Sequence, residues 1–211
     1  DQISEVVVVH QNLSQSAARS RAIELLDLVC VPAPSKRVHD YPHQLSGGLR
    51  QRAMIAMALA GEPTLLIADE PTTALDVTVQ SQILELFLEI QSQFKMAIQF
   101  ISHDLGVISE IADEVLVLYG GRAVERASAT ALFDNPRHPY TKGLLATVPR
   151  LGGYRRRLPT IPGQIPNVNN LPSGCPFHDR CSIAEPECAE QEPTFDQVET
   201  GHWVACPKVQ S

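Results

Sequence analysis

The chain has 211 residues, 44% of them apolar and 19% charged, a composition typical of a globular protein with a buried core. Its longest apolar runs fall far short of the roughly 20 residues that a membrane-spanning helix requires. The formal net charge is −7, and the clearest basic run, residues 155–157, is too short to attract a polyanion. We therefore expect no nucleic-acid partner. These arginines fit a solvated loop best, with contact to acidic lipid or a partner subunit as the alternative.

The first predicted helix covers residues 15–29, where apolar side chains recur every three or four positions. Pro32 prevents this helix from continuing. Ser46 then stands where a helix cap is expected, before a run of strong helix formers over residues 49–60. Gly61 ends this second helix. The front of the chain is therefore predicted to be helical.

A short apolar strand is predicted over residues 64–68, and it runs directly into Asp69 and Glu70. The proline that follows cannot continue a central strand, so the two acids lie at the strand's carboxyl end. An apolar stripe with helical spacing occupies residues 79–90, and a second β-like stretch covers residues 96–101. The order is therefore strand, helix, strand.

The alternation continues with a helix over residues 104–112 that opens on an acidic residue, and a buried strand over residues 114–119. Gly120 and Gly121 predict a turn into a short pairing strand that ends near Glu125. Helices that alternate with strands indicate an α/β fold with a mostly parallel sheet. Beyond residue 148 prolines recur and four of the five cysteines gather, so we expect a separate, irregular C-terminal segment.

Ser46, Gly47 and Gly48 place a hydroxyl group and two glycines at the start of a helix. Free backbone N–H groups and the helix dipole favour an anion at such a position, which predicts a phosphate contact. Taken alone, the same pattern is more often a simple helix cap. The other motifs decide between these interpretations.

Two adjacent carboxylates at a strand's carboxyl end lie where open α/β sheets bind ligands. Asp69 is expected to hold Mg²⁺ through water, and Glu70 to polarise the water that attacks a γ-phosphate, because phosphoryl transfer needs charge compensation and a positioned nucleophile. His103 follows the next strand, so we expect it at the same edge as Glu70. A neutral imidazole there can bond to a γ-phosphate oxygen. A lone histidine at a strand end is otherwise usually a surface residue.

Four segments in sequence resemble the motifs of ABC transporter ATPases. LSGGLRQR (residues 45–52) resembles the ABC signature, LLIADEP (65–71) the Walker B strand, TTALD (72–76) the D-loop and ISHD (101–104) the switch histidine. The resemblance implies a RecA-like P-loop NTPase fold, ATP and Mg²⁺ as ligands, and a dimer of two ATPase subunits. It further implies that signature residues contact ATP held by the opposite subunit, and that the D-loop connects the two sites. The signature residues are Ser46, Gly47, Gly48 and Gln51, and the D-loop residue is Asp76.

A phosphate-binding loop of the form G-x-x-x-x-G-K-[ST] is missing from the sequence. The resemblance then implies three parts: a helical subdomain with the signature over residues 1–60, part of the ATPase core over residues 61–148, and a C-terminal extension over residues 149–211. The chain starts at Asp1 with no secretory signal pattern, and we expect the nucleotide-binding front half to lie outside it. On its own the chain is not expected to bind or hydrolyse ATP well.

Cys175, Cys181, Cys188 and Cys206 suggest one site, whereas Cys30 lies alone and is expected to be an inert core residue. Disulfides are disfavoured in a cytosolic ATPase because the cytosol is reducing. Structural zinc or an iron–sulfur cluster are then the metal centres that four thiolates could bind. The tight C-x2–4-C pair of zinc sites is missing, so the pattern favours a 4Fe–4S cluster. Reduced, unligated cysteines are the alternative.

Three further strings, NPRHPYTKGLL (residues 135–145), IPGQIP (161–166) and SGCPFHDRC (173–181), resemble the C-terminal region of ABC ATPases from dipeptide, oligopeptide and nickel importers. This resemblance implies peptide import and a cysteine set of the iron–sulfur type. It also implies membrane-spanning permease subunits as direct partners, an extracytoplasmic peptide-binding protein as an indirect one, and a peripheral position on the cytoplasmic face of the plasma membrane.

Two other functional hypotheses stay open at this point. One is a soluble ABC ATPase whose cysteine site is a metal-binding module, which the acidic charge and the importer-like C-terminal strings disfavour. The other is a non-catalytic remnant that only folds or binds metal. Neither the cargo, whether dipeptide, longer peptide or nickel, nor the identity of the metal can be decided from the residues.

Overall fold

The computed structural model describes residues 1–148 and 160–209. The chain forms two compact units, residues 1–103 and residues 104–211. This division falls inside the segment 61–148 predicted as one part of the ATPase core, and the boundaries at 60 and 148 stay predictions. The basic run at 155–157 lies outside the described residues. In the described part of the chain, no helix combines the length and the apolar character needed to cross a membrane.

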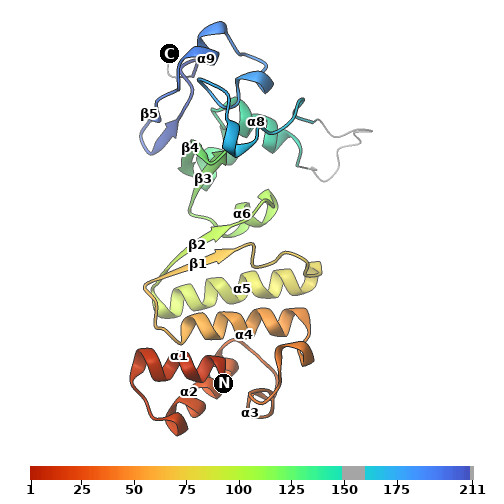
Figure 1. Ribbon diagram of the computed structural model, residues 1–211, viewed down its shortest axis with the longest axis vertical. Helices are drawn as coiled ribbons and strands as arrows, with labels where there is room; N and C mark the ends of the chain where they lie inside the picture. Colours follow the sequence, from red (N-terminus) through yellow and green to blue (C-terminus); the bar gives the residue numbers. More distant parts are fainter. Residues whose placement is uncertain (149–159, 210–211) are drawn as a thin grey trace. The chain divides into compact units, whose positions relative to one another are not determined.

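The first unit consists of a two-stranded sheet with helices on one side, as Figure 1 shows. The long helix α5 lies next to the sheet, α4 lies beyond α5, and α1 and α2 lie beyond α4. The elements of this unit are α1 (Gln2–Gln11), α2 (Gln15–Leu28), α3 (Pro34–Arg37), the 3-10 turn η1 (Pro42–Gln44), α4 (Gly47–Leu59), β1 (Leu65–Asp69), α5 (Val77–Phe94) and β2 (Ala97–Ile101).

The core of this unit lies between the sheet and the helices. The apolar stripe of α5 is buried as its helical spacing predicts, with Ile83 and Ile90 almost fully enclosed. Phe87 of α5 meets Phe100 of β2 edge to face, with ring centroids 5.5 Å apart. These contacts fix α5 against the sheet and thereby fix the loop that enters α5.

Strands β1 and β2 pair in parallel, and their carboxyl ends coincide because Leu65 lies opposite Ala97 and Asp69 opposite Ile101. The ladder extends one residue further, since the backbone N–H of Glu70 donates to the carbonyl of Ile101 at 2.9 Å. Residues that follow β1 and β2 therefore emerge side by side at one edge of the sheet.

The second unit is built on an antiparallel sheet with the strand order β3-β4-β6-β5. Hairpin β5–β6 comes from the end of the chain and joins β4 through the pairs Glu125–Val204 and Arg126–Trp203. The described elements of this unit are α6 (Leu105–Ile111), β3 (Glu114–Tyr119), β4 (Arg122–Ser128), α7 (Ala129–Asp134), α8 (Pro139–Ala146), η2 (Val168–Asn170), η3 (His178–Arg180), α9 (Pro186–Glu190), β5 (Asp196–Glu199) and β6 (His202–Val204).

The sheets differ from the sequence prediction in two respects. The predicted mostly parallel arrangement holds for β1 and β2, whereas β3 belongs to a separate antiparallel sheet. The turn predicted at Gly120 and Gly121 is confirmed, with φ angles of 58° and 79°, and the pairing strand β4 runs on to Ser128. The C-terminal segment was predicted to be irregular, but its β5–β6 hairpin extends this sheet.

Cys30 does not lie in the core, which contradicts the sequence prediction. The helix α2 ends before it, and Cys30 adopts a left-handed backbone conformation with φ 58°. Its backbone N–H bonds to the carbonyl of Asp27 at 2.8 Å, so the residue belongs to the turn that leaves the helix. As a result Cys30 is exposed.

Candidate functional site

Glu70 and His103 lie together at the carboxyl edge of β1 and β2. Glu70 directly follows β1, His103 comes shortly after β2, and His103 Nδ1 lies 2.9 Å from Glu70 Oε1. Both side chains are accessible, with 45% of Glu70 and 77% of His103 exposed. The predicted meeting of these two residues at one sheet edge is therefore present in the structure.

The Glu70 carboxylate is held in its ionised form. Hydrogen bonds from His103 and from the hydroxyl of Thr73 lower its pKa below the usual value for a glutamate, and the small effect of burial works in the opposite direction. Hydrogen bonds to the charged form of an acid favour that form. Glu70 is therefore a carboxylate at neutral pH, available to accept a proton or to orient a water molecule.

Asp69 is the last residue of β1, and it is exposed at the same edge. A carboxylate is the kind of oxygen ligand that Mg²⁺ prefers, usually with several waters retained around the ion. The chemistry and the exposure of Asp69 therefore fit a water-mediated contact to Mg²⁺.

The predicted signature residues lie at the start of α4. Ser46 is the cap of this helix, and its hydroxyl accepts a hydrogen bond from the backbone N–H of Leu49 at 3.4 Å. Asp76 caps α5 in the same way, accepting from the backbone N–H of Val79 at 3.0 Å. Gln51 lies one turn into α4 and is half-buried. Two capped helix starts therefore lie in the same unit as Asp69, Glu70 and His103.

Gly47 and Gly48 bring the start of α4 against the start of α5. A methyl group added at Gly48 would lie 2.7 Å from a methyl carbon of Val79, which is closer than real contacts allow, whereas one at Gly47 would meet Leu75 at an ordinary 3.5 Å. Close helix packing is therefore one physical reason for glycine at position 48, independent of any ligand.

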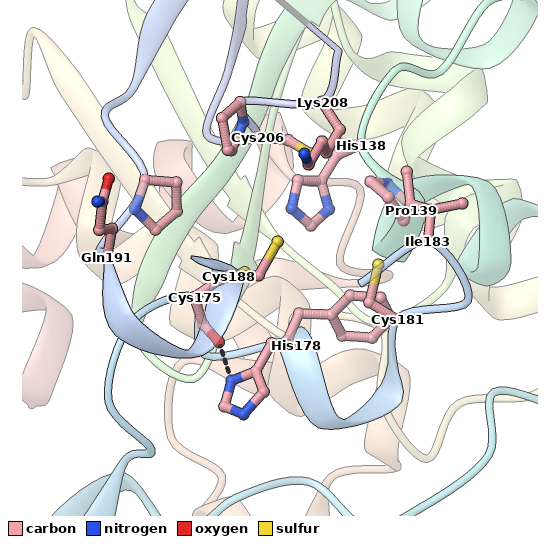
Figure 2. Close-up of a pocket in the computed structure, with 13 residues that line it drawn as sticks. His138, Pro139, Cys175, His178, Cys181, Ile183, Cys188, Gln191, Cys206 and Lys208 are labelled. Atoms are coloured by element: carbon pink, nitrogen blue, oxygen red, sulfur yellow. Dashed lines mark hydrogen bonds between the residues drawn. The ribbon is translucent and has the colours of Figure 1, made fainter. Parts of the chain in front are cut away.

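The cysteines Cys175, Cys181, Cys188 and Cys206 line one pocket of the second unit, together with His138 (Figure 2). Burial is the main cause that raises the pKa of Cys175, Cys181 and Cys206, and neighbouring thiols raise it further. These three side chains are consequently thiols rather than thiolates at neutral pH.

The pocket does not have the geometry of the predicted metal centre. Within residues 1–148 and 160–209 no three His, Cys, Asp or Glu side chains are arranged to hold a metal ion. The cysteines come from separate segments around η3, α9 and the end of β6. As placed, they do not fit an iron–sulfur cluster or zinc.

Sequence reasoning missed a buried carboxylate in the second unit. Glu125 is fully enclosed and accepts hydrogen bonds from the backbone N–H groups of Arg137 (2.6 Å) and His138 (2.9 Å), and it lies 2.7 Å from His202 Nε2. It thus ties β4 to the segment before α8 and to β6. The sequence holds no signal for this burial, since strict alternation after Val124 would place Glu125 towards solvent.

Comparison with protein families gives two matches along the chain. Residues 2–73 match the family described as ABC transporter, and residues 124–188 match the family described as the oligopeptide/dipeptide transporter C-terminal region. The first match contains the turn at Ser46 and the acids Asp69 and Glu70, and the second contains Glu125 and three of the four pocket cysteines.

Curated relatives are similar over nearly the whole chain. A probable peptide ABC transporter ATP-binding protein of Sinorhizobium fredii is 50% identical over 206 residues, which cover 97% of this chain and 62% of the relative. A putative peptide import ATP-binding protein of Brucella melitensis is 52% identical over 212 residues, covering 98% of this chain and 63% of the relative. The chain thus spans a little over three fifths of the length of these relatives.

Two solved structures share the fold. One is cbiO1 of Clostridium perfringens, part of the ABC transporter complex cbiONQ, with a TM-score of 0.54 and 29% identity; the match covers 63% of this chain and 51% of that one. The other is an inward-facing putative metal-chelate type ABC transporter, with a TM-score of 0.53 and 25% identity over 62% of this chain and 53% of that one. They confirm the predicted fold class, a partial ABC ATPase domain.

Proposed function

We propose that this chain acts in ATP hydrolysis for peptide import, because residues 2–73 match the ABC transporter family and residues 124–188 match the oligopeptide/dipeptide transporter C-terminal region. The curated relatives described as peptide import ATP-binding proteins support the cargo class. The observation that carries the enzymatic part is the exposed Glu70–His103 contact of 2.9 Å, directly after Asp69, at the carboxyl edge of the parallel strands.

In this proposal Glu70 is the catalytic base. Its carboxylate is ionised and exposed, so it can orient a water molecule towards the γ-phosphate of ATP and accept a proton as the water attacks. Asp69 holds Mg²⁺ through water, and the ion, when bound, neutralises charge on the phosphate oxygens. The neighbouring carboxylates thus have separate tasks.

His103 is proposed to contact the γ-phosphate. In the structure its Nδ1–H donates to Glu70 Oε1. In this proposal the ring turns so that an N–H donates to a phosphate oxygen instead of to Glu70. This movement changes the hydrogen bonding of the base when phosphate binds.

The remaining signature residues are proposed to act on a second subunit. Ser46, Gly47, Gly48 and Gln51 lie at or near the start of α4, where backbone N–H groups and the helix dipole favour an anion, and they would contact ATP held by the opposite ATPase subunit. Asp76, at the start of α5, would connect the two sites. The active enzyme is therefore a dimer in this proposal.

We further propose that the dimer drives two membrane-spanning permease subunits from the cytoplasmic face of the membrane, and that these receive peptides from an extracytoplasmic binding protein. ATP closes the dimer, and hydrolysis reopens it. The phosphate-binding loop that this chain does not contain would come from additional sequence, as the greater length of the relatives suggests. A protein of the relatives' length, containing this chain and such a loop, is hereafter the parent protein.

Glu70→Gln in the parent protein tests the enzymatic proposal. Glutamine keeps the size of the side chain but is a very weak base, so turnover is expected to fall by roughly 100- to 10,000-fold. ATP-driven dimerisation should persist because the phosphate contacts remain. Phosphate release and analytical ultracentrifugation with ATP measure the two properties, and normal turnover in Glu70→Gln would remove Glu70 from the mechanism.

For the four pocket cysteines we propose that metal analysis distinguishes three states: a 4Fe–4S cluster, bound zinc and reduced thiols. Their presence in one pocket favours a 4Fe–4S cluster, with zinc as the alternative, whereas their arrangement, which brings no three described metal-ligating side chains together, favours reduced thiols. Anaerobically purified protein is examined by ultraviolet–visible spectroscopy and by iron and zinc analysis. A broad charge-transfer absorption with iron indicates the cluster, stoichiometric zinc without colour indicates zinc, and neither indicates free thiols.

A further inference from the structure

The turn that follows β1 has an unusual backbone at Glu70. Its N–H still bonds to Ile101 at the end of the ladder, but its φ angle is 47°, in the left-handed region that non-glycine residues rarely adopt. The carbonyl of Glu70 then accepts the backbone N–H of Thr73 at 3.2 Å, which closes the turn. This left-handed turn brings Thr73 back towards the side chain of Glu70.

The turn lets Thr73 bond to the side chain of Glu70 as well as to its backbone. The Thr73 hydroxyl donates to Glu70 Oε2 at 3.0 Å, while His103 occupies Oε1 at 2.9 Å. A glutamate side chain otherwise has three freely rotating bonds, so two donors on two different oxygens restrict it to one orientation. One of the two donors is local, and the other comes from the neighbouring strand.

The two donors have different freedom to move. His103 is 77% exposed. Under the proposed function its side chain turns away from Glu70 and donates to a phosphate oxygen. Thr73 belongs to the same four-residue turn as Glu70 and is held to it by the backbone bond, so its contact persists when His103 leaves. Once His103 has left Glu70, Thr73 is the one of these two residues that still restrains the carboxylate.

We propose that Thr73 is a positioning residue: its hydroxyl holds the Glu70 carboxylate in the orientation needed to direct the attacking water. This inference rests on the proposed role of Glu70. Thr73 is itself exposed, so its hydroxyl serves no core packing and can be removed without loss of the fold.

Thr73→Val in the parent protein tests the inference, because valine keeps the shape of threonine and removes only the hydroxyl. We expect kcat to fall by about 10- to 100-fold, since a misplaced catalytic group costs this much, while KM for ATP and ATP-driven dimerisation stay unchanged. Thr73→Ser restores the hydroxyl and should recover most of kcat. The matched control is Thr64→Val, the same change at an exposed position before the opposite end of β1, which should leave turnover unaltered.

Three results would overturn the inference: full kcat in Thr73→Val, an equal loss in Thr73→Ser, or a loss that appears only as a raised KM. A double variant separates this inference from the proposed function. In a Glu70→Gln background, Thr73→Val should cause no further loss, because its effect acts through Glu70. If Glu70→Gln itself turns over normally, the proposed function fails; if Glu70→Gln is inactive and Thr73→Val is normal, only the positioning role fails.

Discussion

Each unit of the molecule contains a glutamate paired with a histidine, and the two pairs differ in their surroundings. Glu70 and His103 lie 2.9 Å apart with 45% and 77% of their side chains exposed, whereas Glu125 and His202 lie 2.7 Å apart with 0% and 4% exposed. The first pair lies at an open sheet edge. The second is enclosed and receives two further backbone N–H donors.

The comparison shows that the same two side chains serve different purposes according to burial. Water competes for every hydrogen bond of the exposed pair, so that pair contributes little to stability and its groups are free to meet a ligand. No water can replace a buried carboxylate as the acceptor for its donors, so we expect Glu125 to stabilise the fold of its unit. The predictions below test this contrast from the largest expected effect to the smallest.

Removing the buried carboxylate should have the largest effect on stability. Glu125→Ala leaves three donors without an acceptor, those of His138 and His202 buried and that of Arg137 partly buried, and should destabilise the second unit by about 3–5 kcal/mol, the cost typical of breaking a buried pair. Urea unfolding followed by the fluorescence of Trp203 measures it, because Trp203 is the only tryptophan in the sequence and lies on β6. Glu70→Ala is the control, and its unfolding is followed by circular dichroism because Trp203 lies in the other unit. It should not shift the transition, and equal effects of the two variants would refute the contrast.

Acid should weaken the second unit through His138. Burial is the main cause that lowers the pKa of His138 to about 4, and the Glu125 carboxylate opposes this shift. The ring stays neutral, with Nδ1 accepting the backbone N–H of Tyr140 at 3.0 Å. Between the usual histidine pKa of 6.5 and about 4, the unfolded chain binds a proton that the folded chain does not, so stability falls as the pH decreases through this window.

The loss over this window should approach about 3 kcal/mol for a histidine shifted this far. Unfolding free energies from the Trp203 signal at several pH values between 4 and 7 measure it. His138→Asn offers an oxygen in place of Nδ1 and does not titrate, so its stability should decline less with acid. The same acid slope in both proteins would show that another group is responsible.

Replacing each histidine by leucine should have the smallest effect on stability. It should also distinguish most clearly between the buried structural pair and the exposed pair. His202→Leu keeps the volume of the ring but removes one donor from Glu125, at a cost of about 1–3 kcal/mol. His103→Leu should leave unfolding unchanged and lower ATP turnover in the parent protein. Unfolding of both variants and phosphate release by His103→Leu are measured, and a destabilised His103→Leu would show that the exposed pair is structural after all.

Local chemistry allowed several elements to be predicted closely. The strand over residues 114–119 has the predicted bounds, and the predicted helix over 15–29 corresponds to α2, Gln15–Leu28. Ser46 and Asp104 cap helices as expected, because a short polar side chain before an apolar helix satisfies its first N–H groups. The meeting of Glu70 with His103 also followed from local pattern, since each comes after a strand and parallel strands end at one edge.

Long-range pairing and backbone irregularities could not be predicted. Hairpin β5–β6 joins β4 across 77 residues between Glu125 and His202, and no local periodicity specifies such a partner. Glu125 is buried because the register shifts between Val117 and Leu118, so that the regular alternation of inward and outward side chains is interrupted in β4. The contact of Thr73 with Glu70 could not be predicted for a similar reason, since it depends on the left-handed backbone conformation of Glu70.

The missing side chain at Gly48 has a mechanical consequence. With no side chain at position 48, the entrance of α4 lies directly against Val79 in the first turn of α5. Any larger residue at position 48 would push the start of α5 away, and only a short segment separates that start from the turn at Glu70 and Thr73. The spacing of the two helix entrances is therefore set by the absence of a single methyl group.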